Sequence, residues 1–276
     1  MKPYRTLCIL VLMSVLQALP ALAGGWRFAY NLKPGQTWTA TMNQQNTFDM
    51  MGQKQNDRRK TVIRYTVTKG TKSGWVGITA KIRQGAAGEG GPDLGKLTFT
   101  ADMHTTGEIR NKRVTGSAAP PMPDTEGMPP EMKAMMVQSY QSIGEMWKEA
   151  VFWFPEFPEE KLDIGDEFEM TQKMGSGGGA MGLESVIKQV FTLEDVSDGL
   201  AYFDVRQRAV TKTGGMGAKT DTKTAGKGET IFDLKEGMWV EVVTRSQSVV
   251  NMGAVPGMAG GTQKMQHMTK IAIERR

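Results

Sequence analysis

Cysteine is almost absent from this chain. The 276-residue sequence contains one cysteine, Cys8, which lies inside an apolar N-terminal segment. Once that segment is removed, the remaining chain has no thiol, so disulfide bonds, thiol catalysis and cysteine metal sites are excluded from it. Such a protein must be held together by its hydrophobic core.

Histidine is also scarce, since only His104 and His267 occur. The sequence contains no His-Glu-x-x-His pattern and no Gly-x-Ser-x-Gly pattern, which are typical of zinc peptidases and acyl-transfer serines. Carboxylates cluster between residues 156 and 169, where a solvated acidic hairpin is a simpler interpretation than a glycosidase pair. We therefore expect a non-catalytic protein without a cofactor.

The N-terminal segment predicts export. It is basic at Lys2 and Arg5, mostly apolar from Leu7 to Leu19, and ends in Ala21-Leu22-Ala23. This pattern is typical of a secretory signal peptide at 1–23, cleaved near Ala23. The apolar part is shorter than the roughly 20 residues of a membrane-spanning helix, and Cys8 is not placed for lipidation. We expect a periplasmic or secreted protein that is not an integral membrane protein; an uncleaved anchor is the alternative.

Charge is distributed unevenly along the chain. Residues 24–117 contain 15 basic and 6 acidic residues, whereas residues 118–170 contain 3 basic and 12 acidic ones. Opposite charges attract usefully only within a Debye length, about 8–10 Å, so we expect the acidic middle to lie against the basic first part. The basic residues are not interleaved with aromatic ones, and nucleic acid is not an expected partner.

Most of the chain after residue 24 has the alternation of β-strands. Apolar and polar residues alternate in about ten runs that are rich in Val, Ile, Thr and aromatic residues. The predicted fold is mainly β, with a large curved antiparallel sheet, half-barrel or barrel-like, since a sheet of this size must curl or close. We expect hairpin loops at 175–182 and 213–228. The predicted strands cover 38–42, 61–68, 76–82, 97–103, 185–193, 200–210, 229–234, 238–250 and 265–273.

One segment differs from the rest. Residues 120–130 are rich in proline and predict an extended linker. A helix is expected at 131–151, because apolar residues recur there at spacings of three and four and Pro155 prevents its continuation. The apolar face predicts a binding site for a hydrophobic ligand, formed by Met132, Met136, Tyr140, Ile143 and Trp147.

The two halves of the chain resemble each other. The run Leu32-x-x-Gly35-x-x-Trp38 matches Leu162-x-x-Gly165-x-x-Phe168, and Gly74 and Gly107 have counterparts in Gly199 and Gly237. Chance similarity between strands is the alternative to a duplication. We predict a single β-rich domain at 24–276, built from two similar halves joined by one helix: a first half at 26–117, a linker and helix at 118–158 and a second half at 159–276.

Methionine is abundant, with 21 residues in the chain. Flexible thioethers suit a core or an adaptable apolar surface. Thioethers also bind Cu(I), and the segment containing Met265, His267 and Met268 is a candidate copper site. In a strand, however, Met268 would point away from the other two.

The paired starts at Leu32 and Leu162, and the Asp-Met and Asp-Leu hairpins before Gly107 and Gly237, resemble those of uncharacterised bacterial exported β-rich proteins. The predicted curved sheet with one helix also resembles the half-barrel envelope proteins of the LolA, LolB and LppX type. This resemblance implies carriage of a lipid or lipoprotein. The missing lipidated cysteine departs from LolB and LppX but not from soluble LolA.

Three functions remain open. The first is binding of a lipid or other apolar ligand beneath the helix, which the methionine-rich helix face favours. The second is a structural or scaffolding role in which an envelope protein partner binds the sheet edges or the acidic segment. The third is periplasmic Cu(I) binding.

Overall fold

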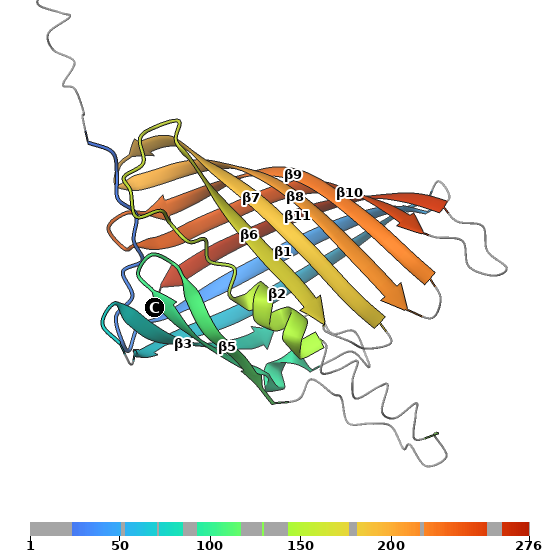
Figure 1. Cartoon of the computed structure of the whole chain (residues 1–276), viewed down its shortest axis with the longest axis horizontal. Coiled ribbons are helices and arrows are strands. Elements are labelled where there is room, and N and C mark those ends of the chain that lie inside the picture. Colours follow the sequence, from blue (N-terminus) through green and yellow to red (C-terminus); the bar gives the residue numbers. More distant parts are fainter. Residues whose placement is uncertain are drawn as a thin grey trace, which may run out of the picture.

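The computed structural model describes residues 24–50, 53–70, 72–84, 93–116, 129, 143–176, 181–215, 218–252 and 261–275. The predicted signal peptide and the predicted helix before residue 143 lie outside these ranges. The described chain forms one curved sheet of eleven strands (Figure 1). The expected mainly β fold with a large curved antiparallel sheet is therefore confirmed.

The strands are long, and those of the second half reach 17 residues. Residues 143–151 form the α-helix of the described chain, and a short 3-10 helix, η1 (Leu94–Lys96), precedes β4. The strands are β1 (Thr37–Met50), β2 (Gln53–Lys69), β3 (Trp75–Gln84), β4 (Thr98–His104), β5 (Ile109–Thr115), β6 (Glu167–Ser176), β7 (Met181–Ser197), β8 (Leu200–Gly215), β9 (Ala218–Asp233), β10 (Met238–Met252) and β11 (Gly261–Arg275).

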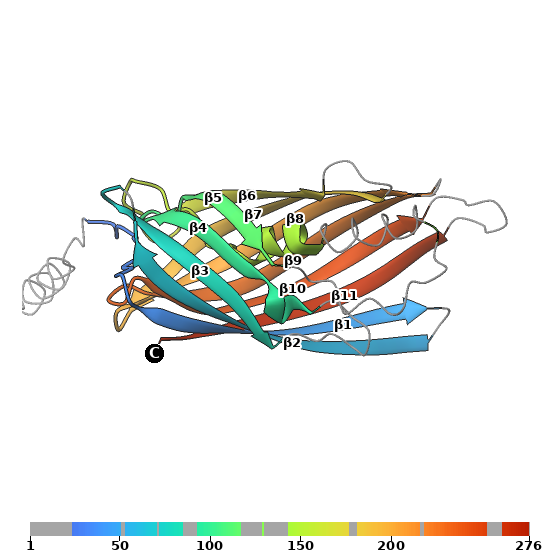
Figure 2. The same ribbon diagram turned by 90° about the horizontal axis from the view of Figure 1, so that it is seen from below.

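The strand order is β5-β4-β3-β2-β1-β11-β10-β9-β8-β7-β6. Each half of the chain is an antiparallel meander, and the two meanders join where the first strand, β1, pairs with the last, β11. Strands β5 and β6 are the two free edges, so the sheet is not closed. Figure 2 shows the curvature, with β1 and β2 on the opposite side from β5 and β6.

The turns that begin the two halves have matching hydrogen bonds. Gly35 N donates to Val67 O over 2.9 Å, and Gly165 N donates to Leu193 O over 2.7 Å. Both glycines have positive φ, 91° and 92°, which a residue with a Cβ adopts only at a cost. The similar sequences at these positions thus make the same turn into β1 and β6.

Alternation along the strands places the core on one face of the sheet. On β1 the buried residues are Trp38, Ala40 and Met42, which point to the same side because successive Cβ atoms alternate. We call this side the inner face and the opposite side the outer face. The helix lies on the inner face, where Tyr65 of β2 bonds its last turn.

Aromatic side chains fill the inner face at the end where β1 begins. Phe157 lies at their centre, with ring centroids 5.0 Å from Phe232 and 5.5 Å from Trp239. Each buried aromatic residue contributes about 1.5–3 kcal/mol by leaving water, so this cluster supplies much of the folding free energy. Its members are Phe28, Tyr30, Trp38, Tyr65, Phe154, Phe157, Phe168, Phe191, Phe203, Phe232 and Trp239.

Two local predictions were wrong. Residues 218–228 are not part of a loop but the first half of β9, because β8 and β10 both hydrogen-bond to them. The acidic segment 156–169 is not a hairpin either: it is irregular up to Glu167, where β6 begins, and Leu162 pairs with Trp26 in an isolated bridge. The predictions made from charge and turn-forming residues alone were therefore wrong for both segments.

Candidate functional site

The helix at 143–151 lies between the two free edges of the sheet (Figure 1). Its residue Glu149 bonds to both: Lys112 Nζ of β5 lies 2.5 Å from Glu149 Oε2, and Gln172 Nε2 of β6 donates to the Glu149 carbonyl over 2.7 Å. Within the described residues, this is the one ion pair between the basic first part and the acidic middle, whereas Glu167 and Glu169 pair with Arg206 and Lys188 of the second half. The helix therefore bridges the opening of the sheet.

Two of the five predicted ligand-binding residues can be placed. Ile143 and Trp147, one helical turn apart, are partly buried and pack against the core. Met132, Met136 and Tyr140 lie outside the described residues. The described part of the helix thus contributes its apolar face to the core, and a ligand contact at these residues stays a prediction.

The chain after the helix enters the aromatic cluster. Val151, Phe152 and Phe154 are each less than 5% exposed. Tyr65 donates to the Val151 carbonyl over 2.8 Å and Tyr30 to the Pro155 carbonyl over 2.9 Å. This end of the inner face is filled by protein side chains.

Two buried tyrosines hold protons tightly. Burial raises the pKa of Tyr30 well above its ordinary value, although the bond from Trp239 Nε1, 2.8 Å long, acts in the opposite direction. Burial also raises the pKa of Tyr65. Both hydroxyls donate to backbone carbonyls and thereby fix the chain after the helix against the sheet.

Beyond the aromatic cluster the inner face changes character. Short polar side chains replace the aromatic ones, and several are joined across strands, as in the bonds Ser185–Thr211 at 2.8 Å and Thr224–Ser248 at 2.7 Å. Ser185 and Ser248 are buried, while Thr211 and Thr224 are partly exposed. The short side chains of β8, β9 and β10 on this face are Ala209, Thr211, Thr213, Thr220, Thr222, Thr224, Gly226, Gly228, Thr244, Ser246 and Ser248.

The candidate copper residues do not converge. Met265 and His267 of β11 lie on the inner face, opposite Phe48 and Asn46 of β1, whereas Met268 lies on the outer face and is 37% exposed. His267 Nδ1 lies 2.8 Å from Asn46 Oδ1, and burial lowers the pKa of its ring. Within the described ranges, no three His, Cys, Asp or Glu side chains are grouped to hold a metal ion.

A group of charged residues near His104 escaped the sequence analysis. Burial, and then the charge of Glu108, raise the pKa of Glu156, while Arg110 and His104 oppose this shift. His104 Nδ1 is 3.0 Å from Thr106 Oγ1, as suits a turn residue. His104, Glu108 and Arg110 belong to the β4–β5 hairpin and Glu156 to the segment after the helix, so no local sequence signal joins Glu156 to the others.

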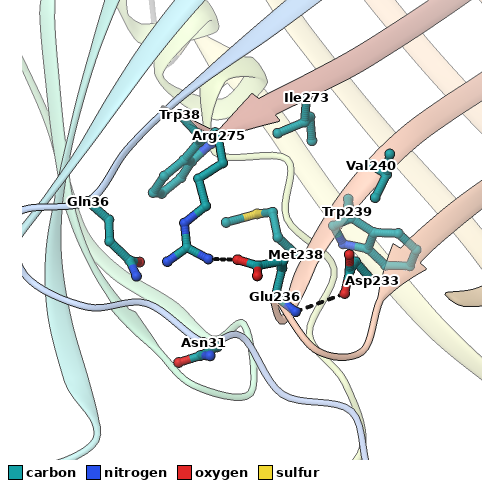
Figure 3. Close-up of a pocket in the computed structure, with 10 residues that line it drawn as sticks. All are labelled: Asn31, Gln36, Trp38, Asp233, Glu236, Met238, Trp239, Val240, Ile273 and Arg275. Carbon is teal, nitrogen blue, oxygen red and sulfur yellow. Dashed lines mark hydrogen bonds and ion pairs between the residues drawn. The ribbon is translucent and has the colours of Figure 1, made fainter. Parts of the chain in front are cut away.

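A small cavity of about 180 Å³ lies at the aromatic end, near the start of β10 (Figure 3). Trp38, Met238 and Trp239 line it, together with the ion-paired Arg275 and Glu236. No partner for Trp38 Nε1 occurs in the part of the chain that the structure describes. The volume admits a few water molecules or a very small ligand.

None of the helices in the described ranges is long and apolar enough to span a membrane.

No protein-family model matches the chain, and no curated protein matches it. Among solved structures it is similar to OccAB3 of Acinetobacter baumannii, with 5% identity, TM-score 0.23, and coverage of 88% of this chain and 99% of that one. It is also similar to OccK2 (OpdF) of Pseudomonas aeruginosa, with 7% identity, TM-score 0.24, and coverage of 91% and 99%. A further match is OpdK of the same organism with vanillate, with 6% identity, TM-score 0.23, and coverage of 91% and 100%. Likeness at these TM-scores carries no argument about fold or function.

Proposed function

We propose that this chain is an exported, non-catalytic binding protein that carries a lipid-like ligand on the inner face of its sheet, beyond the aromatic cluster. The ligand would be amphipathic. Its apolar part would contact side chains such as Ile187 and Met265, and its polar part the hydroxyl groups of β8, β9 and β10. This refines the expected purely apolar ligand, because the inner face away from the core is rich in threonine and serine.

One observation carries the proposal: the long strands continue past the core with an inner face of small side chains. A strand of 15–17 residues with a core function alone would carry large apolar residues along its whole inner face. Instead, β9 presents Thr220, Thr222 and Thr224 on this face. Hydroxyl groups there would orient the polar part of a bound molecule.

Export is part of the proposal. The basic, apolar and small-residue segment before Gly24 supports cleavage near Ala23 and a periplasmic or secreted location. The open curved sheet with a helix at its opening supports the resemblance to envelope proteins of the LolA type. The matching turns at Gly35 and Gly165 support an internal duplication.

A bulky substitution on the inner face tests the site. Thr222 lies on the inner face of β9 and its neighbour Asp221 on the outer face. Thr222→Trp should displace the ligand, whereas Asp221→Trp, a matched control on the same strand, should retain it. The readout is the mass of material extracted from the exported, purified protein. Equal retention by both variants would exclude this face.

Scaffolding is the second candidate, and the filled aromatic end favours it. There the helix and residues 152–157 close over a packed core, as in a rigid structural element. An envelope protein partner would then bind the free edge strands β5 and β6. Cu(I) binding remains a prediction, and titration calorimetry of the purified protein with Cu(I) under reducing conditions tests it.

A further inference from the structure

The outer face of the sheet carries a band of positive charge. It spans three neighbouring registers, that is, three rows of residues that pair across strands β6 to β11. One acidic residue, Glu169, lies in these rows. We call these three registers the basic band. Its cations are Lys173, Lys188, Arg206, Arg208, Lys223, Lys227, Arg245 and Lys264.

Two of these cations form ion pairs within the described residues. Lys188 pairs with Glu169 over 2.5 Å, and Arg206 pairs with Glu167, in the adjacent register, over 2.5 Å. Among the described residues, the other cations of the basic band have no ion pair. The next row of the outer face, toward the aromatic end, carries acidic residues, including Asp204 and Glu229. The positive charge therefore ends at this row.

Three of the cations lie in direct register. Arg206 of β8 is opposite Lys227 of β9, and Lys227 is opposite Arg245 of β10. Like charges directly opposite each other on one face of a sheet destabilise it. An anion bound between them would remove this repulsion.

A hollow in the outer face lies at the same place. Its volume is about 640 Å³, and its wall includes Lys227, Arg245, Gln247 and Met268. The wall therefore combines two cations, the amide groups of three glutamines and an exposed thioether. This is a suitable environment for a phosphate group with an apolar neighbour.

Apolar side chains are exposed within the basic band. Val186 and Val210 are each 45% exposed and lie opposite each other, and Met268 is 37% exposed. No aromatic side chain lies in these three registers, so the band lacks the stacking surfaces that single-stranded nucleic acid requires. Cations interleaved with aliphatic groups match the headgroup region of an anionic membrane.

We propose that the basic band docks the protein on membranes with anionic phospholipid headgroups, with a headgroup phosphate in the hollow between Lys227 and Arg245. Each basic residue near an anionic membrane surface contributes about 1 kcal/mol of attraction. The interaction is electrostatic, so added salt should weaken it. The proposal concerns the outer face and is independent of a ligand on the inner face.

Vesicle co-sedimentation of the mature protein tests this proposal. We expect binding to vesicles of phosphatidylglycerol and phosphatidylcholine, and little binding to phosphatidylcholine alone. The double variant Lys227→Gln/Arg245→Gln should bind roughly 30-fold more weakly. The control Lys33→Gln/Lys235→Gln removes the same charge from exposed positions elsewhere and should bind like the wild type.

Circular dichroism melts of all variants establish that they are folded. The charge-conserving variant Lys227→Arg/Arg245→Lys should restore most of the binding. Equal weakening by the control variant, or equal binding to both kinds of vesicle, would overturn the proposal. So would binding to soluble heparin with none to anionic vesicles, which would indicate a soluble polyanion as the partner.

Discussion

Lys112 of β5 and Glu149 of the helix form an ion pair of 2.5 Å whose side chains are only 23% and 22% exposed. The Glu149 carbonyl also accepts a hydrogen bond from Gln172 of β6. One helical residue thus connects the two edges that the sheet leaves unpaired. A partly buried pair is screened less than a surface pair, so it fixes the helix in the opening.

Breaking this pair should destabilise the protein. We expect Lys112→Met to lower the free energy of unfolding by about 1–3 kcal/mol, because Glu149 would keep a partly buried charge without its partner. Urea denaturation of the mature protein measures the change. Lys188→Met, which breaks the exposed pair with Glu169, should cost at most about 1 kcal/mol. Equal costs would show that the helix does not depend on the Lys112 contact.

Tyr30 should be essential to the aromatic end. Tyr30→Phe removes a hydroxyl that accepts from Trp239 Nε1 and donates to the Pro155 carbonyl, leaving two buried polar groups unpaired. We expect a loss of about 1–3 kcal/mol in thermal or urea unfolding. The control Tyr202→Phe, on the outer face of β8, should change stability by less than about 0.5 kcal/mol.

The turn glycines of the two halves should respond alike. Nothing lies within 4 Å of a Cβ built at Gly35 or Gly165, so substitution by alanine at either position adds only backbone strain. We expect each variant to lose about 1–2 kcal/mol. At Gly107 the added Cβ would also lie 2.3 Å from the Pro155 carbonyl oxygen, so Gly107→Ala should cost more than either. Unequal costs at Gly35 and Gly165 would contradict their structural equivalence.

His267 should make stability depend on pH. Burial lowers the pKa of His267 below its ordinary value of 6.5, so the folded state favours the neutral ring. The unfolded chain then binds the proton more readily, and the contribution to stability is present above pH 6.5 and lost as the pH falls below it. The variant His267→Gln has no ionisable group at this position. Its urea midpoint should therefore fall less than that of the wild type between about pH 7.5 and about pH 5.5. Parallel decreases in both proteins would assign the pH dependence to other groups.

Alternation of apolar and polar residues predicted most of the sheet, because at the aromatic end one face of the strands packs on the core. It failed at β5, at β6 and over the first half of β9. Strand β5 has only Ile109 and Val114 as apolar residues and is a free edge, and the first half of β9 is polar or small on both faces. Those segments become strands through hydrogen bonds to neighbours, which no local pattern reveals.

In the candidate sites, too, local patterns were predictable and contacts between distant segments were not. Helical spacing correctly joined Ile143 and Trp147, and strand alternation correctly separated Met268 from Met265 and His267. The basic band could not be predicted, since its cations come from six strands and meet only through the register of the sheet. Glu149 gave no signal of its role either, because both of its partners are distant in sequence.

The most direct test of ligand carriage is native mass spectrometry of the exported, purified protein, followed by organic extraction of whatever it carries. The account predicts an amphipathic, lipid-like molecule at near one-to-one stoichiometry. A protein that is empty after purification, and still empty after incubation with envelope lipids, would contradict the account and favour a scaffolding role.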